Sequence, residues 1–75
     1  MTTDRYTQEK INLGKNIKAV REAADLTQLD LEVRSGVDRG DISKIENGKK
    51  NIEFITIVKL AEALQADLHQ FFPKK

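Results

Sequence analysis

The feature that most constrains the fold is the run TQLDLEVRSGVDRGDISKIENG, because it contains the start and stop signals of two short helices. Thr27 is a preferred N-cap residue, and Asp30 stands three positions later, where a capping box places an acidic or amide side chain. Gly36 can take the left-handed conformation that ends many helices. These signals predict a helix over residues 28–35.

A second helix is predicted directly after this one. Asp38 is an N-cap candidate whose side chain can accept a hydrogen bond from the amide of Gly40 or Asp41, and Gly48 can end the helix. Apolar residues at helical spacing support a helix over residues 39–47. Two short helices joined by a tight turn that contains glycine form a helix-turn-helix.

The two predicted helices have distinct apolar and polar faces. The apolar residues that can lock them together are Leu31, Val37, Ile42 and Ile45. The second helix then turns a polar face outward, which comprises Arg39, Gly40, Asp41, Ser43 and Lys44. That face is the predicted reading surface for a partner.

Composition indicates one small domain. The 75 residues are 39% hydrophobic and 33% charged, which supplies a single modest core. There is no cysteine, and the single histidine, His69, cannot build a metal site alone, so no metal or other cofactor is expected. The sequence also lacks a glycine run that could cradle phosphate and a histidine placed beside a nucleophile, so an enzyme is not predicted.

Charge and hydropathy narrow the range of partners. No apolar run reaches the roughly 20 residues of a membrane span, and the first ten residues lack the apolar segment of a signal peptide. We therefore expect a cytoplasmic protein without a membrane partner. The formal net charge of +1 does not by itself indicate nucleic acid, so any argument for DNA depends on where the charges lie.

The first helix is predicted from apolar periodicity. A helix over about residues 8–24 is indicated by the spacing of Leu13, Ile17, Val20 and Ala24. Residues 1–9 are polar and without periodicity, so they are interpreted as a flexible arm, which leaves residues 10–75 as a single domain. Gly14 either weakens the first helix or marks a close approach to a neighbouring element.

Two further helices are predicted in the C-terminal third. Glu53 or its neighbour begins a helix with a wide apolar face. Asp67 can cap a last short helix that carries Phe71 and Phe72 and ends at Pro73. The sequence thus predicts an all-α domain of five helices.

The runs LTQLDL, SGV, ISKIENGKKN and IVKLAEAL together resemble the Xre/Cro-type family of phage-repressor-like helix-turn-helix regulators. The small size and the run RGDISKIENGKKN are similar to those of the controller proteins of restriction and modification systems. The likeness extends over about residues 11–72. It implies a five-helix, phage-repressor-like DNA-binding domain with the helix-turn-helix at the second and third helices.

The resemblance implies that Arg39 contacts a base, and an arginine can donate to both O6 and N7 of guanine. Ser43 can contact a base or a phosphate, and Lys44 a phosphate. Asp41 either accepts from the amino group of a cytosine or holds Arg39 in place. The full set of residues expected at the DNA is Thr27, Gln28, Asp38, Arg39, Gly40, Asp41, Ser43, Lys44, Asn47, Lys49 and Lys50.

The resemblance also implies a structural ion pair between Arg21 and Glu46, and the alternative is an arginine on an exposed polar face. Two residues depart from the family pattern. Glu32 stands where alanine is usual, so it has to reach solvent or pair with a cation such as Lys44. Leu29 stands where a polar residue is usual, so it is either exposed or part of a contact.

The predicted function is that of a sequence-specific, double-stranded DNA-binding transcriptional regulator. It would act as a homodimer on a pseudo-palindromic operator and regulate its own gene, and no small-molecule ligand is expected. The candidate dimer contacts are Phe54, Leu68, Phe71 and Phe72, because two adjacent phenylalanines are hard to bury in so small a protein. In the alternative, both phenylalanines fold back under the first helix. The second functional hypothesis is an antitoxin-like subunit that uses the same fold to bind a protein.

Overall fold

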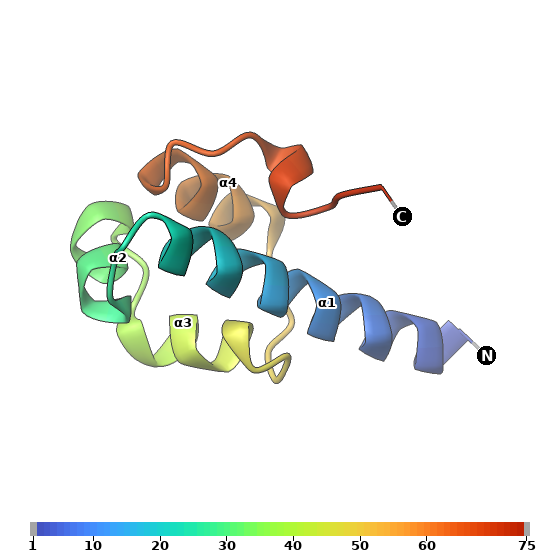
Figure 1. Ribbon diagram of the computed structural model, residues 1–75. Helices are drawn as coiled ribbons and strands as arrows, with labels where there is room; N and C mark the ends of the chain where they lie inside the picture. The colour runs from blue at the N-terminus through green and yellow to red at the C-terminus, as the bar shows by residue number, and fades with distance from the viewer. Residues whose placement is uncertain (1, 75) are drawn as a thin grey trace.

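The computed structural model describes residues 2–74, so Met1 of the predicted arm and Lys75 lie outside it. Its elements are α1 (Thr2–Ala23), α2 (Gln28–Ser35), α3 (Arg39–Glu46), α4 (Phe54–Ala63) and the 3-10 helix η1 (Leu68–Gln70) (Figure 1). No strand occurs in the described range, and the all-α prediction is confirmed. The count of five α-helices is not confirmed, because the last element is a single 3-10 turn. Pro73 disfavours a helical conformation at Phe72, which leaves too short a segment for an α-helix.

Helix α1 begins well before the start predicted from the sequence, and it includes residues 2–9. This segment extends past the core (Figure 1), which is why it lacks apolar periodicity. Contacts within the helix occur there instead: Nε of Arg5 lies 3.7 Å from Oε2 of Glu9, and Nζ of Lys10 lies 5.2 Å from the ring centre of Tyr6. The predicted helix start is therefore wrong, whereas the flexibility of this segment stays a prediction.

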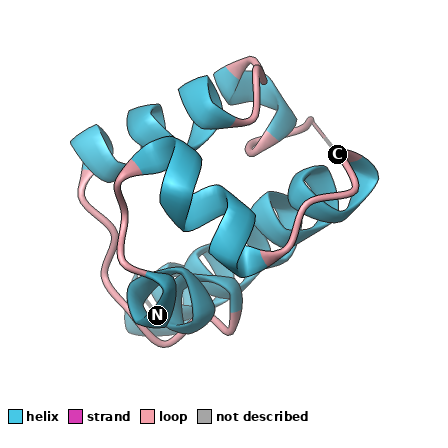
Figure 2. Cartoon of the chain, turned by 90° about the vertical axis from the view of Figure 1, so that its left-hand side faces the viewer, coloured by secondary structure: helices cyan, strands magenta, loops and turns pink. Residues whose placement is uncertain are grey.

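The helices surround one core in an elongated molecule that measures 37 × 25 × 19 Å. Helix α3 packs against α1 and α2, and α4 packs against α2 (Figures 1 and 2). After η1 the chain returns to α1, where Nδ2 of Asn16 donates to the carbonyl oxygen of Phe71 at 2.9 Å. None of the helices formed by residues 2–74 is long and apolar enough to cross a membrane.

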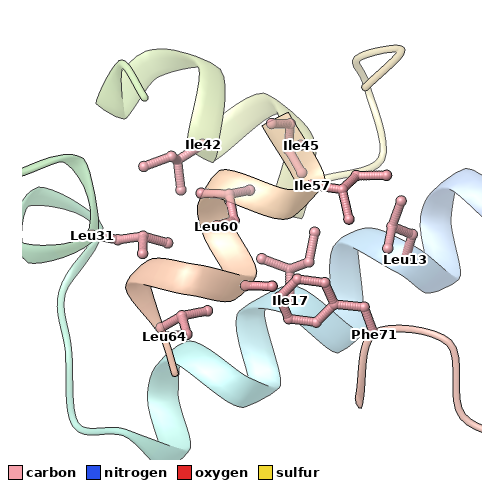
Figure 3. Close-up of a cluster of buried hydrophobic side chains, with 10 residues drawn as sticks. Leu13, Ile17, Leu31, Ile42, Ile45, Ile57, Leu60, Leu64 and Phe71 are labelled. Atoms are coloured by element: carbon pink, nitrogen blue, oxygen red, sulfur yellow. The ribbon is translucent and has the colours of Figure 1, made fainter. Parts of the chain in front are cut away.

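The centre of the core contains one fully buried side chain from each α-helix and one from the C-terminal segment. These are Ile17, Leu31, Ile42, Leu60 and Phe71 (Figure 3). Because Phe71 is 0% exposed, its predicted role in a dimer contact is wrong. The turn at η1 and the hydrogen bond from Asn16 direct the chain back onto α1, which places the ring inside. Phe72 is 53% exposed, so the two phenylalanines do not both fold under α1.

Gly14 lies where α1 crosses the end of α3. A Cβ atom at this position would collide with the carbonyl oxygen of Ile45 and lie 3.0 Å from that of Glu46. Of the two interpretations offered by the sequence, the structure shows the close approach. The absence of a side chain at Gly14 lets α1 come near the last turn of α3, and this contact helps to set the position of the helix-turn-helix.

Candidate nucleic-acid interface

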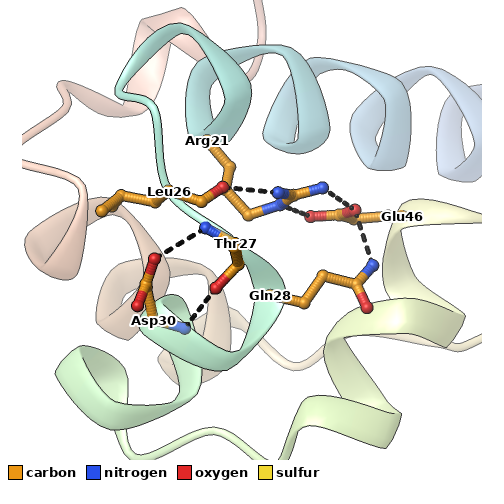
Figure 4. Close-up of polar contacts among 6 residues, drawn as sticks. All are labelled: Arg21, Leu26, Thr27, Gln28, Asp30 and Glu46. Carbon is orange, nitrogen blue, oxygen red and sulfur yellow. Dashed lines mark hydrogen bonds and ion pairs between the residues drawn. The ribbon is translucent and has the colours of Figure 1, made fainter.

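Helix α2 has the bounds and the caps predicted from the sequence. The amide of Asp30 donates to Oγ1 of Thr27 at 3.0 Å, and the amide of Thr27 donates to Oδ2 of Asp30 at 2.9 Å (Figure 4). The hydrogen bonds to Thr27 favour the ionised carboxylate and lower the pKa of Asp30. Gly36 closes the helix with φ 78°, in the left-handed region. Both side chains of the predicted capping box are thus engaged by α2 itself.

A buried ion pair joins α1 to the end of α3. Nε of Arg21 donates to Oε2 of Glu46 at 2.7 Å, and its NH2 group donates to Oε1 at 3.0 Å (Figure 4). The two side chains are only 9% and 2% exposed. The hydrogen bonds to Glu46 raise the pKa of Arg21 above its already high ordinary value. The structure therefore contains the Arg21–Glu46 pair that the resemblance implies, and the exposed alternative is excluded.

The same ion pair also reaches the start of α2. The NH1 group of Arg21 donates to the carbonyl oxygen of Leu26 at 2.6 Å, and Nε2 of Gln28 donates to Oε1 of Glu46 at 3.0 Å (Figure 4). Three helices therefore meet at one carboxylate. Because the Gln28 side chain is half-buried and bonded to Glu46, it contributes to holding α2 against α3.

Two carboxylates bind the free amides at the start of α3. Oδ2 of Asp38 accepts from the amide of Gly40 at 2.9 Å and from that of Asp41 at 3.3 Å, so Asp38 is the predicted N-cap. Oε2 of Glu32 accepts from the amide of Arg39 at 2.9 Å. Glu32 is half-buried, and within the described residues it forms no ion pair with Lys44. The expected pairing with Lys44 is therefore not found. The carboxylate lies at the partly exposed surface, where it binds the backbone of the next helix.

Helix α3 buries one face and exposes the other. Ile42, Ile45 and Glu46 face the core. The residues on the outward side are Gly40, Lys44 and Asn47, and all of them are exposed. Arg39 is exposed at the first position of the helix, while Ser43 is half-buried. The outward side of α3 is thus exposed and polar, and at Gly40 no side chain covers the backbone.

Asp41 and Arg39 lie on different sides of α3. Oδ1 of Asp41 lies 3.6 Å from Nζ of Lys50, and both side chains are 42% exposed. Arg39 instead lines an open recess next to Glu22 and Asp25, at the connection from α1 to α2. Residues two apart on a helix point in nearly opposite directions, so Asp41 cannot hold Arg39. The prediction that it does is wrong, and its partner is Lys50.

The basic loop after α3 is attached to the first helix. Gly48 has φ 70° and turns the chain, after which Lys49 is exposed. The hydroxyl of Tyr6 donates to Oδ1 of Asn51 at the other end of this loop. The sequence contains no local signal for this bond, because 45 positions separate its two residues and Tyr6 stands in a segment without periodicity.

The eleven residues expected at the DNA are therefore in three different situations. Those fully open to solvent on or after α3 are Arg39, Gly40, Lys44, Asn47 and Lys49. Those that hold helix starts are Thr27, Gln28 and Asp38. Those that are half-buried on the flanks are Asp41, Ser43 and Lys50. Among residues 2–74, no group of three or more histidine, cysteine, aspartate or glutamate side chains is placed to hold a metal ion.

Sequence comparison places this surface within a family. A family model described as helix-turn-helix matches residues 17–71. The chain is 34% identical over 64 residues to the control protein C.MunI of Mycoplasma sp, covering 84% of this chain and 86% of that protein. It is 46% identical over 55 residues to the HTH-type transcriptional repressor RghR of Bacillus subtilis, covering 72% of this chain but only 41% of the repressor. It is also 42% identical over 48 residues to the antitoxin PezA of Streptococcus pneumoniae, covering 61% of this chain and 30% of the antitoxin.

Structure comparison agrees with this result. The crystal structure of the restriction-modification controller protein C.AhdI from Aeromonas hydrophila is similar, with a TM-score of 0.84 and 31% sequence identity. The similarity covers 87% of this chain and 98% of that chain, so it includes the helix-turn-helix together with its supporting helices. The chain therefore belongs to the helix-turn-helix family of DNA-binding transcriptional regulators, and it resembles the controller proteins of restriction and modification systems.

Proposed function

We propose that the protein is a sequence-specific regulator that binds double-stranded DNA as a homodimer, on a pseudo-palindromic operator at its own gene. The observation that carries this proposal is the exposed polar side of α3. The buried Arg21–Glu46 pair holds the opposite side of this helix against α1 and α2. A short helix fixed in this way can enter the major groove of B-DNA, whose width suits one α-helix.

In this proposal Arg39 reads a base at the start of α3. Its exposed guanidinium can donate to O6 and N7 of one guanine, and such a bidentate pair discriminates by about 1–3 kcal/mol against another base. Gly40 has no side chain, so the backbone of α3 can lie close to the DNA. Lys44 and Asn47 are exposed on the outward side of α3, and Lys49 is exposed in the loop that follows. All three suit phosphate contacts, which set affinity and register.

Thr27 and Asp38 serve the interface by holding the starts of α2 and α3. Their side-chain oxygens accept from backbone amides of their own helices. Since these oxygens are engaged, we assign to both residues a positioning role, and the contact with DNA to the neighbouring exposed cations.

The homodimer is supported by an apolar surface on α4. Phe54 is 66% exposed, Ile55 60% and Val58 37%, and the three residues lie on one side of the helix. Exposed apolar residues that adjoin one another are a feature of protein–protein interaction sites. A two-fold axis through this surface would present two copies of α3 to half-sites about one helical turn apart.

The proposal is tested by titrating labelled DNA from the upstream region of the gene beside scrambled DNA of equal length, at several salt concentrations. The wild type is expected to prefer the upstream DNA and to bind less tightly as salt rises. Arg39→Ala is expected to lose about 1–3 kcal/mol of binding free energy and most of the preference. Lys15→Ala is the control, because it removes a cation from α1 beside the C-terminal segment. Equal weak binding to both DNAs would refute the proposal.

An antitoxin-like subunit is the second candidate, and the match to the antitoxin PezA favours it. Of the two terminal aromatics that this hypothesis depends on, only Phe72 is exposed. Binding of a protein partner that Phe72→Ser abolishes and Arg39→Ala leaves unchanged would support this alternative. The opposite pattern would support the DNA-binding regulator.

A further inference from the structure

Backbone amides in the turn between α2 and α3 donate hydrogen bonds to acceptors of nearby residues. The amide of Gly36 donates to the carbonyl oxygen of Glu32 at 2.8 Å, and that of Val37 donates to Oγ of Ser35 at 3.0 Å. The next helix is capped by Asp38, through the amide of Gly40. These bonds are local, because each joins residues no more than four positions apart.

The hydrogen bond from the Arg39 amide to the Glu32 carboxylate differs from the others, because it links the two helices. Glu32 lies in the body of α2, and its Oε2 accepts from the first amide of α3 at 2.9 Å across seven positions of the chain. The residue that donates this amide is Arg39, whose side chain is the proposed base reader. The carboxylate thereby holds the Cα atom from which the guanidinium extends.

From this geometry we propose that Glu32 is a positioning residue that sets the direction in which Arg39 enters the groove, and that it thereby determines sequence preference. The inference rests on the proposed function, because it assigns a role within DNA reading. A guanidinium at the end of a long side chain can donate to both guanine acceptors only within a narrow range of geometries, so a small rotation of the first turn of α3 moves it off O6 and N7. Packing of the apolar side chains restrains α3 as a whole, whereas Glu32 restrains this first residue.

Glu32 carries a charge as well as an acceptor, and two substitutions separate these properties. Glu32→Gln removes the charge and keeps an oxygen that can accept from the Arg39 amide. Glu32→Ala removes both. If Glu32 acted only by repelling phosphate, both variants would bind every DNA more tightly and to the same extent. If it positions Arg39, the two variants differ in sequence preference.

The test measures the ratio of affinities for upstream and scrambled DNA in the wild type, Glu32→Gln, Glu32→Ala and the exposed control Glu62→Gln. We expect the ratio to fall about five- to tenfold in Glu32→Ala, as for the loss of one ordinary hydrogen bond. Glu32→Gln should retain the ratio within about twofold, because the hydrogen bond persists. Equal ratios in wild type and Glu32→Ala, or equal falls in both Glu32 variants, would overturn the role. A wild type without any preference would refute the proposed function itself and this role with it.

Amide hydrogen exchange in the protein without DNA provides a second readout. The amide of Arg39 should exchange several-fold faster in Glu32→Ala than in wild type, with Glu32→Gln close to wild type. The amide of Gly40, which Asp38 holds, is the internal control and should change little. An unchanged exchange rate of the Arg39 amide would show that its hydrogen bond to Glu32 does not restrain α3. Thermal unfolding of each variant confirms that the comparison is between folded proteins.

Discussion

Arg21 links the helices that arrange the interface. Its guanidinium makes two hydrogen bonds to Glu46 and a third to the carbonyl oxygen of Leu26, so that one side chain connects α1, the start of α2 and the end of α3. The partner carboxylate is 2% exposed. A charge buried to this degree is tolerated only because it is paired and hydrogen-bonded.

The first prediction is that Arg21→Met destabilises the fold strongly. It leaves the Glu46 carboxylate buried without its cation, and we expect the free energy of unfolding to fall by about 3–5 kcal/mol. Chemical denaturation followed by circular dichroism measures this loss. The double variant Arg21→Met, Glu46→Leu is the control and should recover a large part of it, because no buried charge remains. Equal losses in the single and double variants would contradict the explanation.

The second prediction concerns the ion pair between Asp41 and Lys50, which lie 3.6 Å apart on the flank of α3. In the proposed complex with DNA, the carboxylate would repel phosphate and compete with it for Lys50. We therefore expect Asp41→Asn to bind both upstream and scrambled DNA more tightly, with a slope of log affinity against log salt steeper by about 1. Salt titrations measure the slope, with Glu62→Gln on α4 as control. Weaker binding by Asp41→Asn would instead indicate that Asp41 accepts a hydrogen bond from a base.

At the scale of whole helices, the placement of α3 depends on its close contact with α1. The two backbones meet at Gly14, where a Cβ atom would collide with the carbonyl oxygen of Ile45. Any side chain here has to push α1 away from α3. That movement would also stretch the ion pair between Arg21 and Glu46, which lies on the same two helices.

The third prediction is that Gly14→Ala destabilises the protein although alanine favours helices. The gain in helix propensity is at most about 1 kcal/mol, and overpacking a close contact costs about 1–3 kcal/mol. We expect a net loss in thermal unfolding. Lys18→Ala, at an exposed site of α1, should change stability by less than about 0.5 kcal/mol. A Gly14→Ala variant more stable than wild type would show that α1 can shift at little cost.

The elements that the sequence predicts well are those with signals at both ends. Thr27 and Asp30 mark the start of α2, Gly36 its end and Asp38 the start of α3, and each signal is a hydrogen bond or a backbone conformation within a few residues. Such interactions depend little on the rest of the molecule. For this reason the helix-turn-helix and most of its outward face could be located before the structure was known.

The features that the sequence does not predict depend on residues far apart in the chain. Phe71 is buried because Asn16 donates a hydrogen bond to the returning chain. Tyr6 donates one to Asn51, which lies beside α1. Neither pair has a local pattern. Glu32 was recognisable as a departure from the family, yet its partner is a backbone amide, which carries no signature in sequence. The sequence and its family resemblance thus predicted the caps of α2 and α3 and the Arg21–Glu46 pair, and they missed the partner of Glu32.

At the scale of the whole molecule, one chain presents a single copy of α3. Two half-sites one helical turn apart are separated by about 34–36 Å, so one molecule cannot place α3 at both of them. In the proposed homodimer, the exposed apolar side of α4 joins the two copies. It is formed by Phe54, Ile55 and Val58, of which the sequence had indicated only Phe54.

The last prediction is that Phe54→Glu separates the proposed dimer without disturbing the fold. Phe54 is 66% exposed and is the first residue of α4, where an acidic side chain favours the helix. Two carboxylates facing each other across a two-fold axis would repel, and we expect the dimer dissociation constant to rise at least about thirtyfold. Sedimentation velocity over a concentration series measures this constant.

The control Val33→Glu makes a comparable change at a 77% exposed site of α2 and should leave the dimer intact. Because two linked recognition helices bind an operator far more tightly than one, Phe54→Glu should also lose affinity for the full operator while Arg39 stays unchanged. A variant that sediments like a dimeric wild type would move the interface away from α4, and a wild type that stays monomeric would remove the homodimer from the proposal.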